Sequence, residues 1–567
     1  MSEGSALGDR LLGMVPGTKR RKPAAWTHLR SLLEINTETP VRLALVAVLA
    51  ALCGTGVLYI LNSEAKDIEQ QGYNLAHAVI FVLLLVTYRV SQLALIRRAA
   101  GAIETALDAK RRRAIRLVLS LSLRDLDQIE KQTIRSGLSA HYGAISQALV
   151  PLISGFEAII LLVFMFGYLV YLSPLAAGIT VGVLGLTIIG YVNHHKKMTA
   201  ALRSASDSEN AFQRQTDGIV GGAKELQLSS RKRQNLKEAM FGNSEGLAKA
   251  RVNAAGFFAD LIATGTSISY FLAGIVVFIL PIFSGSETDN LSQTVIAIIF
   301  ILSPIGSVVG SMQHASTAQY SLRSINDFEA TLAGLTDPVT VSDEEEKNEP
   351  APVAFETIQL DSVSYQHDGE HGFAIKNINL DLKKGEILFI TGGNGSGKTT
   401  LLRIITGLYP RAAGSIQLND TNVERAPRQP YRELFASVFA DFYLFDGLYG
   451  LSDSDRSTLE RWLRTLKIRD KLAEDLNNLH GEDLSTGQRK RLALALALTE
   501  GRPILVLDEW AADQDPETRR WFYESLLPEL REQGFTCLII THDESYFKHC
   551  DRRIHMVEGR IVDAAKR

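Results

Sequence analysis

Two adjacent carboxylates, Asp508 and Glu509, follow the four apolar residues at 504–507. A short apolar run is typical of a strand buried on both faces, so we expect a strand that ends where the acids begin. Carboxylates can hold Mg²⁺ and can act as general bases toward water. We expect Asp508 to hold Mg²⁺ through its water shell and Glu509 to face an attacking water.

A second group of residues has the types and spacing that bind phosphate. The segment Gly392–Thr399 reads G-x-x-x-x-G-K-T between an apolar run and a helical pattern, within GEILFITGGNGSGKTTLLRIITG at 385–407. Backbone N–H groups of such a loop surround phosphates, and the N-terminus of the following helix adds positive potential. We expect Lys398 to reach the β- and γ-phosphates of ATP and the Thr399 hydroxyl to ligate Mg²⁺. The predicted phosphate-binding residues are Gly392, Gly393, Asn394, Gly395, Ser396, Gly397, Lys398, Thr399 and Thr400.

The strand at 504–507 should lie beside the phosphate loop in a parallel sheet. A similar design recurs in TCLIITHD at 536–543, where another apolar strand ends in a polar residue, His542. We expect His542 to contact the γ-phosphate. With Glu509 it forms the predicted catalytic pair for in-line attack of water on that phosphate.

A further helix N-terminus follows in DLSTGQRKRLALALAL at 483–498. Ser485, Gly487 and Gln488 open this helix, which makes a second anion site. A phosphate already held by 392–399 leaves no room for that site within one chain. We therefore expect two copies to face each other, each helix covering the ATP of the other copy, with Asp515 at the same interface.

Length and composition indicate more than one domain. The chain has 567 residues and a formal net charge of −3, so no overall basic field indicates nucleic acid as a partner. We predict a basic N-terminal segment at 1–40, a transmembrane domain at 41–330, a linker at 331–352 and an ATP-binding domain at 353–567. The cysteines, Cys53, Cys537 and Cys550, lack metal-site spacing and are expected to be reduced or simply apolar.

Hydropathy and charge together predict six membrane spans, because a bilayer-crossing helix needs about 20 apolar residues. The predicted spans are 41–62, 77–96, 148–171, 174–192, 258–283 and 291–313. The segments after the second and fourth spans are long and basic, whereas the other loops are short and acidic or uncharged. The excess of positive charge on the inner side places both termini in the cytoplasm.

The two inner segments have helical patterns and should run past the membrane as cytoplasmic extensions. We expect their tips, near Leu123–Ile129 and Thr216–Lys224, to contact the soluble domain. Three charges inside the predicted spans, Arg89, Glu157 and Asp260, either pair with one another or line a solute cavity.

Together these residues resemble the ATP-binding cassette of ABC transporters. The matching motifs are GGNGSGKT, LSTGQ, LDE, ADQD and THD, and six spans ahead of one cassette look like an exporter-type half-transporter. DEWAADQDP, ITGGNGSGKTT and YRELFASVFADFYLFD look like the cyclic-peptide and siderophore exporter subfamily. The resemblance implies a membrane all-α six-helix transmembrane domain followed by an α/β P-loop nucleotide-binding domain.

The chain departs from the family pattern at several positions. Where most cassettes have a glutamine that touches Mg²⁺, this chain has Ala440 followed by Asp441. Either Asp441 replaces the glutamine through water, or the contact is absent. The aromatic residue that usually stacks on adenine falls on His367 by spacing, but Tyr365 offers a larger flat face and is slightly favoured. Trp510 and Ala511 stand where proline and threonine are usual.

The resemblance implies a homodimeric, ATP-driven exporter in a bacterial inner membrane, in contact with membrane lipids. Its solute would be a peptide-like or amphipathic small molecule: a cyclic peptide, a lipopeptide or a siderophore precursor. A lipid or multidrug flippase would share every nucleotide motif and stays an alternative, as does an assembly ATPase docked to other membrane proteins.

Overall fold

The computed structural model describes residues 39–71, 74–279, 291–335, 354–367, 374–424, 429–472, 476 and 484–566. These residues form two compact units. The first contains 1–119 and 130–334, and the second contains 120–129 and 335–567. Each unit is described by itself.

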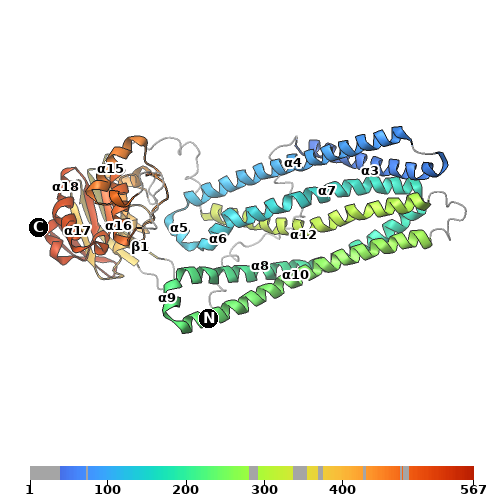
Figure 1. Cartoon of the computed structure of the whole chain (residues 1–567). Coiled ribbons are helices and arrows are strands. Elements are labelled where there is room, and N and C mark those ends of the chain that lie inside the picture. Colours follow the sequence, from blue (N-terminus) through green and yellow to red (C-terminus); the bar gives the residue numbers. More distant parts are fainter. Residues whose placement is uncertain are drawn as a thin grey trace. The chain divides into compact units, whose positions relative to one another are not determined.

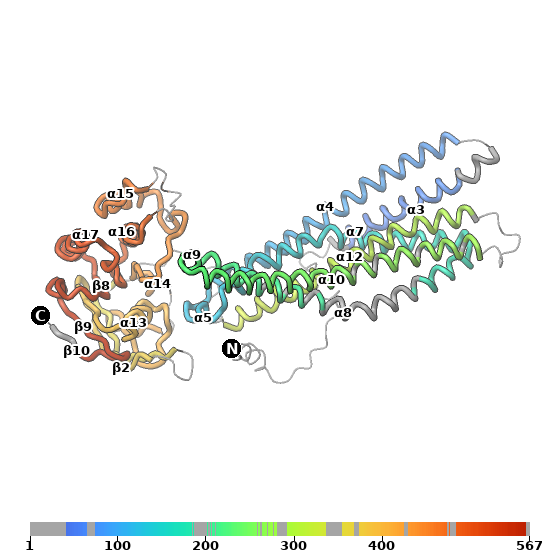
Figure 2. Tube along the Cα trace, turned by 60° about the horizontal axis from the view of Figure 1, so that its bottom comes forward, coloured from blue at the N-terminus to red at the C-terminus, as the bar shows by residue number. Residues whose placement is uncertain are grey.

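Long helices make up the described part of the first unit (Figure 1). They are α3 (Thr39–Gln71), α4 (Leu75–Ser120), α7 (His141–Leu172), α8 (Pro174–Gly221), α10 (Ser230–Phe278) and α12 (Leu291–Leu335). The short α6 (Lys131–Arg135) and a π-helical turn, Ser136–Ala140, lead into α7, and α9 (Ala223–Leu228) joins α8 to α10. Both views show α8 and α10 side by side (Figures 1 and 2).

Within the described residues, four helical stretches are long and apolar enough to cross a membrane. They are Val41–Glu64, Leu75–Ser120, Lys131–Leu172 and Ser292–Leu335. The expected spans at 174–192 and 258–283 fall in α8 and α10; many of their side chains, and residues 280–283, lie outside the described part. Several helices are much longer than a span needs, so they extend beyond a bilayer of ordinary thickness.

Close backbone contact and polar pairs hold these helices together, as is usual where lipid removes the hydrophobic driving force. A Cβ atom at Gly155 of α7 would lie 2.2 Å from the Ser311 hydroxyl of α12, so only glycine fits there. Asn62 of α3 is fully buried, and its amide donates to the Tyr168 hydroxyl and to the Gln293 carbonyl, each at 3.1 Å. These contacts fix the positions of α3, α7 and α12.

The charges expected inside the spans have different environments. Glu157 is 3% exposed, whereas Arg89 and Asp260 are exposed in this single chain. The Gln92 amide nitrogen lies 3.2 Å from Glu157 Oε2 and 3.4 Å from the Tyr88 hydroxyl. Glu157 Oε1 is buried with no hydrogen-bond partner. Glu157 is thus a buried acid held by neutral neighbours.

The second unit contains two sheets. An antiparallel sheet has the order β2-β1-β4-β5, with β1 at Thr357–Gln366, β2 at Ala374–Lys383, β4 at Ala413–Leu418 and β5 at Thr421–Val423. A six-stranded sheet has the order β10-β9-β3-β8-β7-β6. Its strands are β3 (Ile387–Gly392), β6 (Phe435–Val438), β7 (Ile504–Asp508), β8 (Thr536–Ile540), β9 (Arg552–Val557) and β10 (Arg560–Lys566), and only β10 runs antiparallel to its neighbour.

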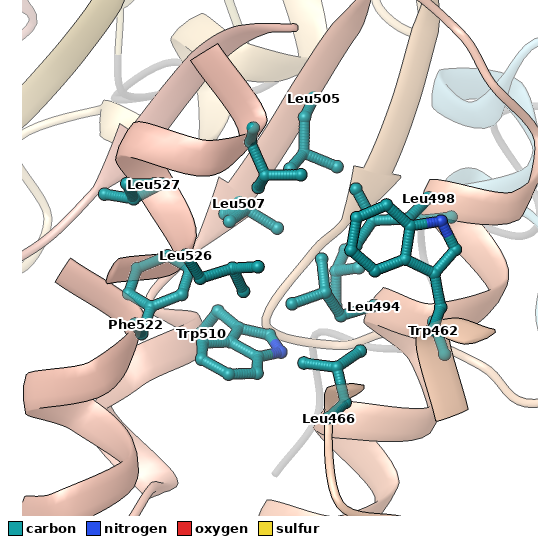
Figure 3. Packing of buried hydrophobic residues seen from close by; sticks show 14 of the residues in the cluster. Trp462, Leu466, Leu494, Leu498, Leu505, Leu507, Trp510, Phe522, Leu526 and Leu527 are labelled. Carbon is teal, nitrogen blue, oxygen red and sulfur yellow. The ribbon is translucent and has the colours of Figure 1, made fainter. Parts of the chain in front are cut away.

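The middle strands β3, β7 and β8 are buried along their whole length and mostly apolar because they are covered on both faces. Alternate residues of β7 enter different clusters: Leu505 and Leu507 pack on one side, Ile504 and Val506 on the other. The first side is covered by α15 (Arg456–Thr465), α16 (Thr486–Thr499) and the segment 516–532, which contains α17 (Pro516–Trp521) and α18 (Leu527–Glu532) (Figure 2). Figure 3 shows Trp462, Trp510 and Phe522 among the leucines of that cluster.

The second side packs against α13 (Lys398–Ile405), β1 and β2. The segment 120–129 belongs to this unit, and Leu123 of α5 (Leu123–Gln128) packs against this cluster. The expected contact of residues 123–129 with the soluble domain is therefore confirmed. Residues 216–224 cluster with the helical unit in this chain.

Candidate nucleotide site

The phosphate loop connects β3 to α13 and depends on glycine. Gly392, Gly395 and Gly397 have φ values of +145°, +76° and +101°, which L side chains rarely adopt. A Cβ atom at Gly392 would also lie 2.3 Å from the Met556 carbonyl oxygen of β9. Lys398 Nζ donates to the carbonyls of Gly392 and Gly393, at 2.9 and 3.1 Å, which holds the ammonium group over the loop.

Thr399 and Asp508 meet at the carboxyl edge of the six-stranded sheet. The Thr399 hydroxyl donates to Asp508 Oδ2 at 2.8 Å, and Asp508 is 2% exposed. The expectation that strand 504–507 adjoins the phosphate loop needs correction, because β8 lies between β3 and β7. Parallel strands end at one common edge, so a strand two places away still delivers its last side chain to α13.

Glu509 sits in a strained backbone conformation. Its φ is +52° and its ψ is 37°, the left-handed region that non-glycine residues seldom occupy. The Glu509 N–H donates to the Ile540 carbonyl at 3.1 Å, and Lys490 Nζ donates to the Glu509 carbonyl at 2.8 Å. Strain held this way is frequent at functional sites.

His542 lies against the same carboxylate. His542 Nε2 is 3.1 Å from Glu509 Oε1, and the two side chains are 47% and 37% exposed. An acid and an imidazole in contact, both open to solvent, can hold a water molecule and accept its proton. The structure therefore brings Lys398, Thr399, Asp508, Glu509 and His542 to one edge of the sheet.

Electrostatics at this edge follow from burial. Burial raises the pKa of Asp508, opposed by the hydrogen bond from Thr399, while the charge of Glu509 raises it further. Burial lowers the pKa of Lys398, opposed by the charges of Glu509 and Asp508. The charged forms of Asp508 and Lys398 are therefore not fully stabilised by their protein neighbours, as is expected where a polyphosphate and a divalent cation bind.

These residues fit Mg²⁺ and ATP on structural grounds. Ser396 in the loop is 6% exposed, and its hydroxyl has no hydrogen-bond partner, so an acceptor such as a phosphate oxygen would satisfy it. Among the described residues, no cluster of three or more His, Cys, Asp or Glu side chains could hold a metal by itself. Thr399 would supply one oxygen ligand and Asp508 would hold the ion through its waters, and Mg²⁺ usually takes its other ligands from phosphate and water.

The predicted signature residues lie at the N-terminus of α16. Ser485 and Gln488 cap the helix reciprocally: the Ser485 N–H donates to Gln488 Oε1 at 3.0 Å, and the Gln488 N–H donates to Ser485 Oγ at 3.3 Å. A Cβ atom at Gly487 would lie 2.7 Å from the Asp513 carbonyl oxygen, so a side chain there would displace that segment. The capped end leaves the first N–H groups of α16 directed outward, as an anion site requires.

Asp515 caps another helix in this chain. Its Oδ1 accepts from the Thr518 N–H at 2.9 Å and its Oδ2 from the Thr518 hydroxyl at 2.7 Å, at the start of α17. The Thr518 N–H and the Thr518 hydroxyl lower the pKa of Asp515. Its predicted role at the contact between two copies stays a prediction.

Sequence reasoning missed Lys490 and the role of Trp510. Lys490 is 4% exposed and ion-paired with Asp513 at 2.7 Å, besides its bond to the Glu509 carbonyl. Trp510 Nε1 donates to the Lys490 carbonyl at 2.8 Å. These bonds tie α16 to the residues after Glu509, where the sequence departs from the family pattern. Lys490 stands between Arg489 and Arg491, and nothing in that charged run marks it as the buried residue.

The two candidates for adenine stacking differ in accessibility. Tyr365 is 3% exposed, and the Tyr409 ring stacks on it at 5.2 Å between centroids. His367 is half-buried and makes edge-to-face contacts with both tyrosine rings. This arrangement favours His367 as the more accessible ring, although Tyr365 has the larger face.

Asp441 follows β6 and pairs with a cation of the protein. Its Oδ2 lies 3.0 Å from Arg403 Nη2, and its side chain is 69% exposed. The N–H of Ala440 lies near enough to Asp508 to lower the pKa of that carboxyl. In this structure the side chain at 441 therefore pairs with Arg403, while the backbone at 440 lies near Asp508.

A family model described as ABC transporter matches residues 375–512. The ATP-binding protein SyrD of Pseudomonas syringae pv. syringae is 34% identical over 415 residues, covering 71% of this chain and 73% of that protein. An ATP-dependent lipid A-core flippase of Chromohalobacter salexigens is 30% identical over 219 residues, covering 36% and 38%. The nisin transport ATP-binding protein NisT of Lactococcus lactis subsp. lactis is 30% identical over 226 residues, covering 36% and 37%.

The fold also matches a solved structure described as a bacterial Atm1-family ABC exporter with ATP bound. The TM-score is 0.72 at 18% sequence identity, and the match covers 93% of this chain and 95% of that one. The likeness includes both the helical unit and the nucleotide-binding unit, and it confirms the fold class expected from the sequence. The chain belongs to the ABC transporter family, as an exporter-type half-transporter whose ATPase activity is coupled to transport.

Proposed function

We propose that this protein exports a peptide-like solute from the cytoplasm across a bacterial inner membrane, as a homodimer. The observation that carries the proposal is the length of the SyrD match. It covers 415 residues, whereas 335–567 contains only 233, so the likeness reaches well into the helical unit, where the solute must pass. The flippase matches are shorter, 219 to 280 residues, so they reach the helical unit less far than the SyrD match or not at all.

The peptide-like class is supported further by the sequence of the cassette. DEWAADQDP and YRELFASVFADFYLFD resemble the exporter subfamily for cyclic peptides, lipopeptides and siderophore precursors. NisT, a relative named for the transport of nisin, matches over the cassette as well. A lipid A-core flippase matches to a similar extent, so lipid or multidrug transport is the competing outcome in the test below.

The geometry supports a cycle in which ATP joins two cassettes. Lys398 and the loop N–H groups would bind the phosphates, and His367 or Tyr365 would contact the adenine. Mg²⁺, held by Thr399 and Asp508, would neutralise charge on the phosphate oxygens. Ser485, Gly487 and Gln488 of the partner copy, with its Asp515, would cover the same nucleotide.

Hydrolysis requires an in-line water. Glu509 would accept a proton from that water as its oxygen attacks the γ-phosphorus, and the bond to the bridging β,γ-oxygen breaks. His542 would orient Glu509 and contact the γ-phosphate. Release of phosphate would separate the cassettes and return the helices to the cytoplasm-facing state.

The proposal is tested by ATP hydrolysis of the purified protein in lipid nanodiscs. The probes are an acylated cyclic peptide, a linear peptide of the same composition, added phospholipid and a hydrophobic drug. Glu509→Gln serves as the blank, and Glu524→Gln, an exposed acid of the same domain, serves as the matched control. Stimulation by the acylated cyclic peptide supports the proposal. Stimulation by lipid or drug alone contradicts it and favours a flippase.

A further inference from the structure

The segment 120–129 is the part of the inner loop that belongs to the nucleotide-binding unit. It joins α4 to α6 in the chain, so it is covalently continuous with two helices of the other unit. Ser122 caps α5 by accepting from the Asp125 N–H at 3.2 Å. On α5, Asp127 Oδ2 accepts a hydrogen bond from the Tyr409 hydroxyl at 2.8 Å.

Tyr409 also contacts α13. Its hydroxyl accepts from Arg403 Nη1 at 3.0 Å while donating to Asp127, so both functions of the hydroxyl are used. Burial raises the pKa of Tyr409, and the hydrogen bond to Asp127 raises it further, so the hydroxyl keeps the proton that it donates. Arg403 lies on the helix that begins with Lys398 and Thr399.

Arg403 in turn holds the loop after β6. Its Nη2 pairs with Asp441 at 3.0 Å. The neighbouring Ala440 N–H lies near enough to Asp508 to lower the pKa of that carboxyl. A series of hydrogen bonds therefore runs from Asp441, next to Ala440, through Arg403 and Tyr409 to Asp127.

The same tyrosine also contacts the adenine-binding candidates. The Tyr409 ring stacks on Tyr365, and the Arg124 guanidinium of α5 lies 6.0 Å from the centre of the Tyr365 ring. The His367 and Tyr409 rings meet edge to face, with 5.8 Å between their centroids. Tyr409 thus contacts α5, the two adenine-binding candidates and Arg403 of α13.

We propose that Asp127, Tyr409 and Arg403 are positioning residues that link the Asp508 edge of the nucleotide site to α5. In this chain the link takes the place of the glutamine missing at 440. ATP that fixes α13 and the loop at 440–441 also fixes Arg403, and through Tyr409 it orders the segment between α4 and α6. The inference rests on the ATP-driven cycle of the proposed function but not on the identity of the solute.

The test is hydrogen–deuterium exchange of the full-length protein in lipid nanodiscs, with and without ATP and Mg²⁺, in the Glu509→Gln background. We expect ATP to slow amide exchange in 122–129 by about tenfold, the factor that one charge-assisted hydrogen bond supplies. Asp127→Asn and Tyr409→Phe should each abolish most of that slowing, and the double variant should lose no more than either single variant.

Asp125→Asn is the matched control, because Asp125 is an acid of the same helix whose side chain bonds to Ser122. It should keep the ATP-dependent slowing. ATP affinity measured by filter binding should stay within about twofold in every variant, less than 0.5 kcal/mol, which shows that the fold is intact. With Glu509 present, Asp127→Asn should lower kcat more than it changes KM for ATP.

The proposal is overturned if ATP slows amide exchange in 122–129 as much in Asp127→Asn as in Asp125→Asn. It is also overturned if the losses of slowing in the two single variants add up in the double variant, or if ATP does not slow exchange in the Glu509→Gln parent. No solute is used in these measurements. Failure of peptides to stimulate ATP hydrolysis would therefore overturn only the proposed solute class. Failure of the exchange experiment would overturn only the proposed link between Asp127, Tyr409 and Arg403.

Discussion

His542 Nε2 lies 3.1 Å from Glu509 Oε1, although 33 residues separate the two in the chain. They meet because β7 and β8 are parallel neighbours whose carboxyl ends lie at one edge. Glu509 is held in a left-handed conformation by two hydrogen bonds: its N–H donates to the Ile540 carbonyl, and its carbonyl accepts from Lys490 Nζ. The carboxylate proposed to accept a proton therefore has a fixed partner before ATP binds.

Removing the imidazole should slow hydrolysis without preventing ATP binding. His542→Ala leaves Glu509 without its partner and the γ-phosphate without a contact, so we expect kcat to fall by about 10²–10³-fold. His542→Gln keeps a hydrogen-bonding group and should recover part of that loss. Phosphate release and filter binding of ATP measure the two effects. Wild-type turnover in His542→Ala would rule out the orienting role.

Trp510 should matter for stability more than its position beside the catalytic residue suggests. It is 1% exposed and donates its indole N–H to the Lys490 carbonyl. Trp510→Phe leaves that carbonyl without its donor and should cost about 1–3 kcal/mol. Trp510→Ala adds a cavity and should cost about 3–5 kcal/mol.

Thermal unfolding in nanodiscs measures this order, with Trp521→Phe as the control, because Trp521 is only partly buried. The unfolding midpoint should fall least in Trp521→Phe, more in Trp510→Phe and most in Trp510→Ala. Equal midpoints for the two phenylalanine variants would show that the Trp510 hydrogen bond adds no stability.

Close packing of α7 on α12 predicts a paired rescue. Gly155→Ala places a methyl group on Ser311 and should destabilise the helical unit by about 1–3 kcal/mol through overpacking. Ser311→Gly in the same chain opens the space and should restore the unfolding midpoint. Gly167→Ala, which meets nothing within 4 Å, is the control and should be neutral or stabilising. A neutral Gly155→Ala would show that the two helices do not pack this closely.

Glu157 should affect the choice of solute. It is buried among neutral neighbours, and its Oε1 has no partner, so a cationic group of a passing solute would find an uncompensated acid. Glu157→Gln should remove the preference for a cationic acylated peptide over a neutral one in stimulating ATP hydrolysis. Glu104→Gln, at an exposed position of α4, should keep it. An unchanged preference in Glu157→Gln would assign Glu157 a structural role.

The nucleotide chemistry was predictable because its residues follow one another in short patterns. The loop 392–399, the Asp508–Glu509 pair and the cap at Ser485 each need only a strand or helix next to them, and the strands and helices form where expected. The order of strands was less accessible. Nothing in the apolar sequence of β8 shows that it separates β3 from β7, because buried parallel strands read alike.

Contacts between distant segments could not be read from the sequence. Tyr409 follows α13 without any motif, yet it stacks on Tyr365 and bonds to Asp127, which is 282 residues away in the chain. Lys490 lies in the charged run 489–491 of α16, where its neighbours Arg489 and Arg491 look the same in the sequence. Such pairs depend on how separate elements pack, and a single sequence records no trace of that packing.

Export of a peptide-like solute can be measured by transport into sealed liposomes that carry the protein with its nucleotide-binding domains outside. An acylated cyclic peptide bearing a fluorophore is supplied with ATP and Mg²⁺, and its accumulation inside is compared for wild type, Glu509→Gln and Glu524→Gln. We expect ATP-dependent accumulation in wild type and Glu524→Gln but none above background in Glu509→Gln. Accumulation of a labelled phospholipid on the inner leaflet, without transport of the peptide, would contradict the proposed function.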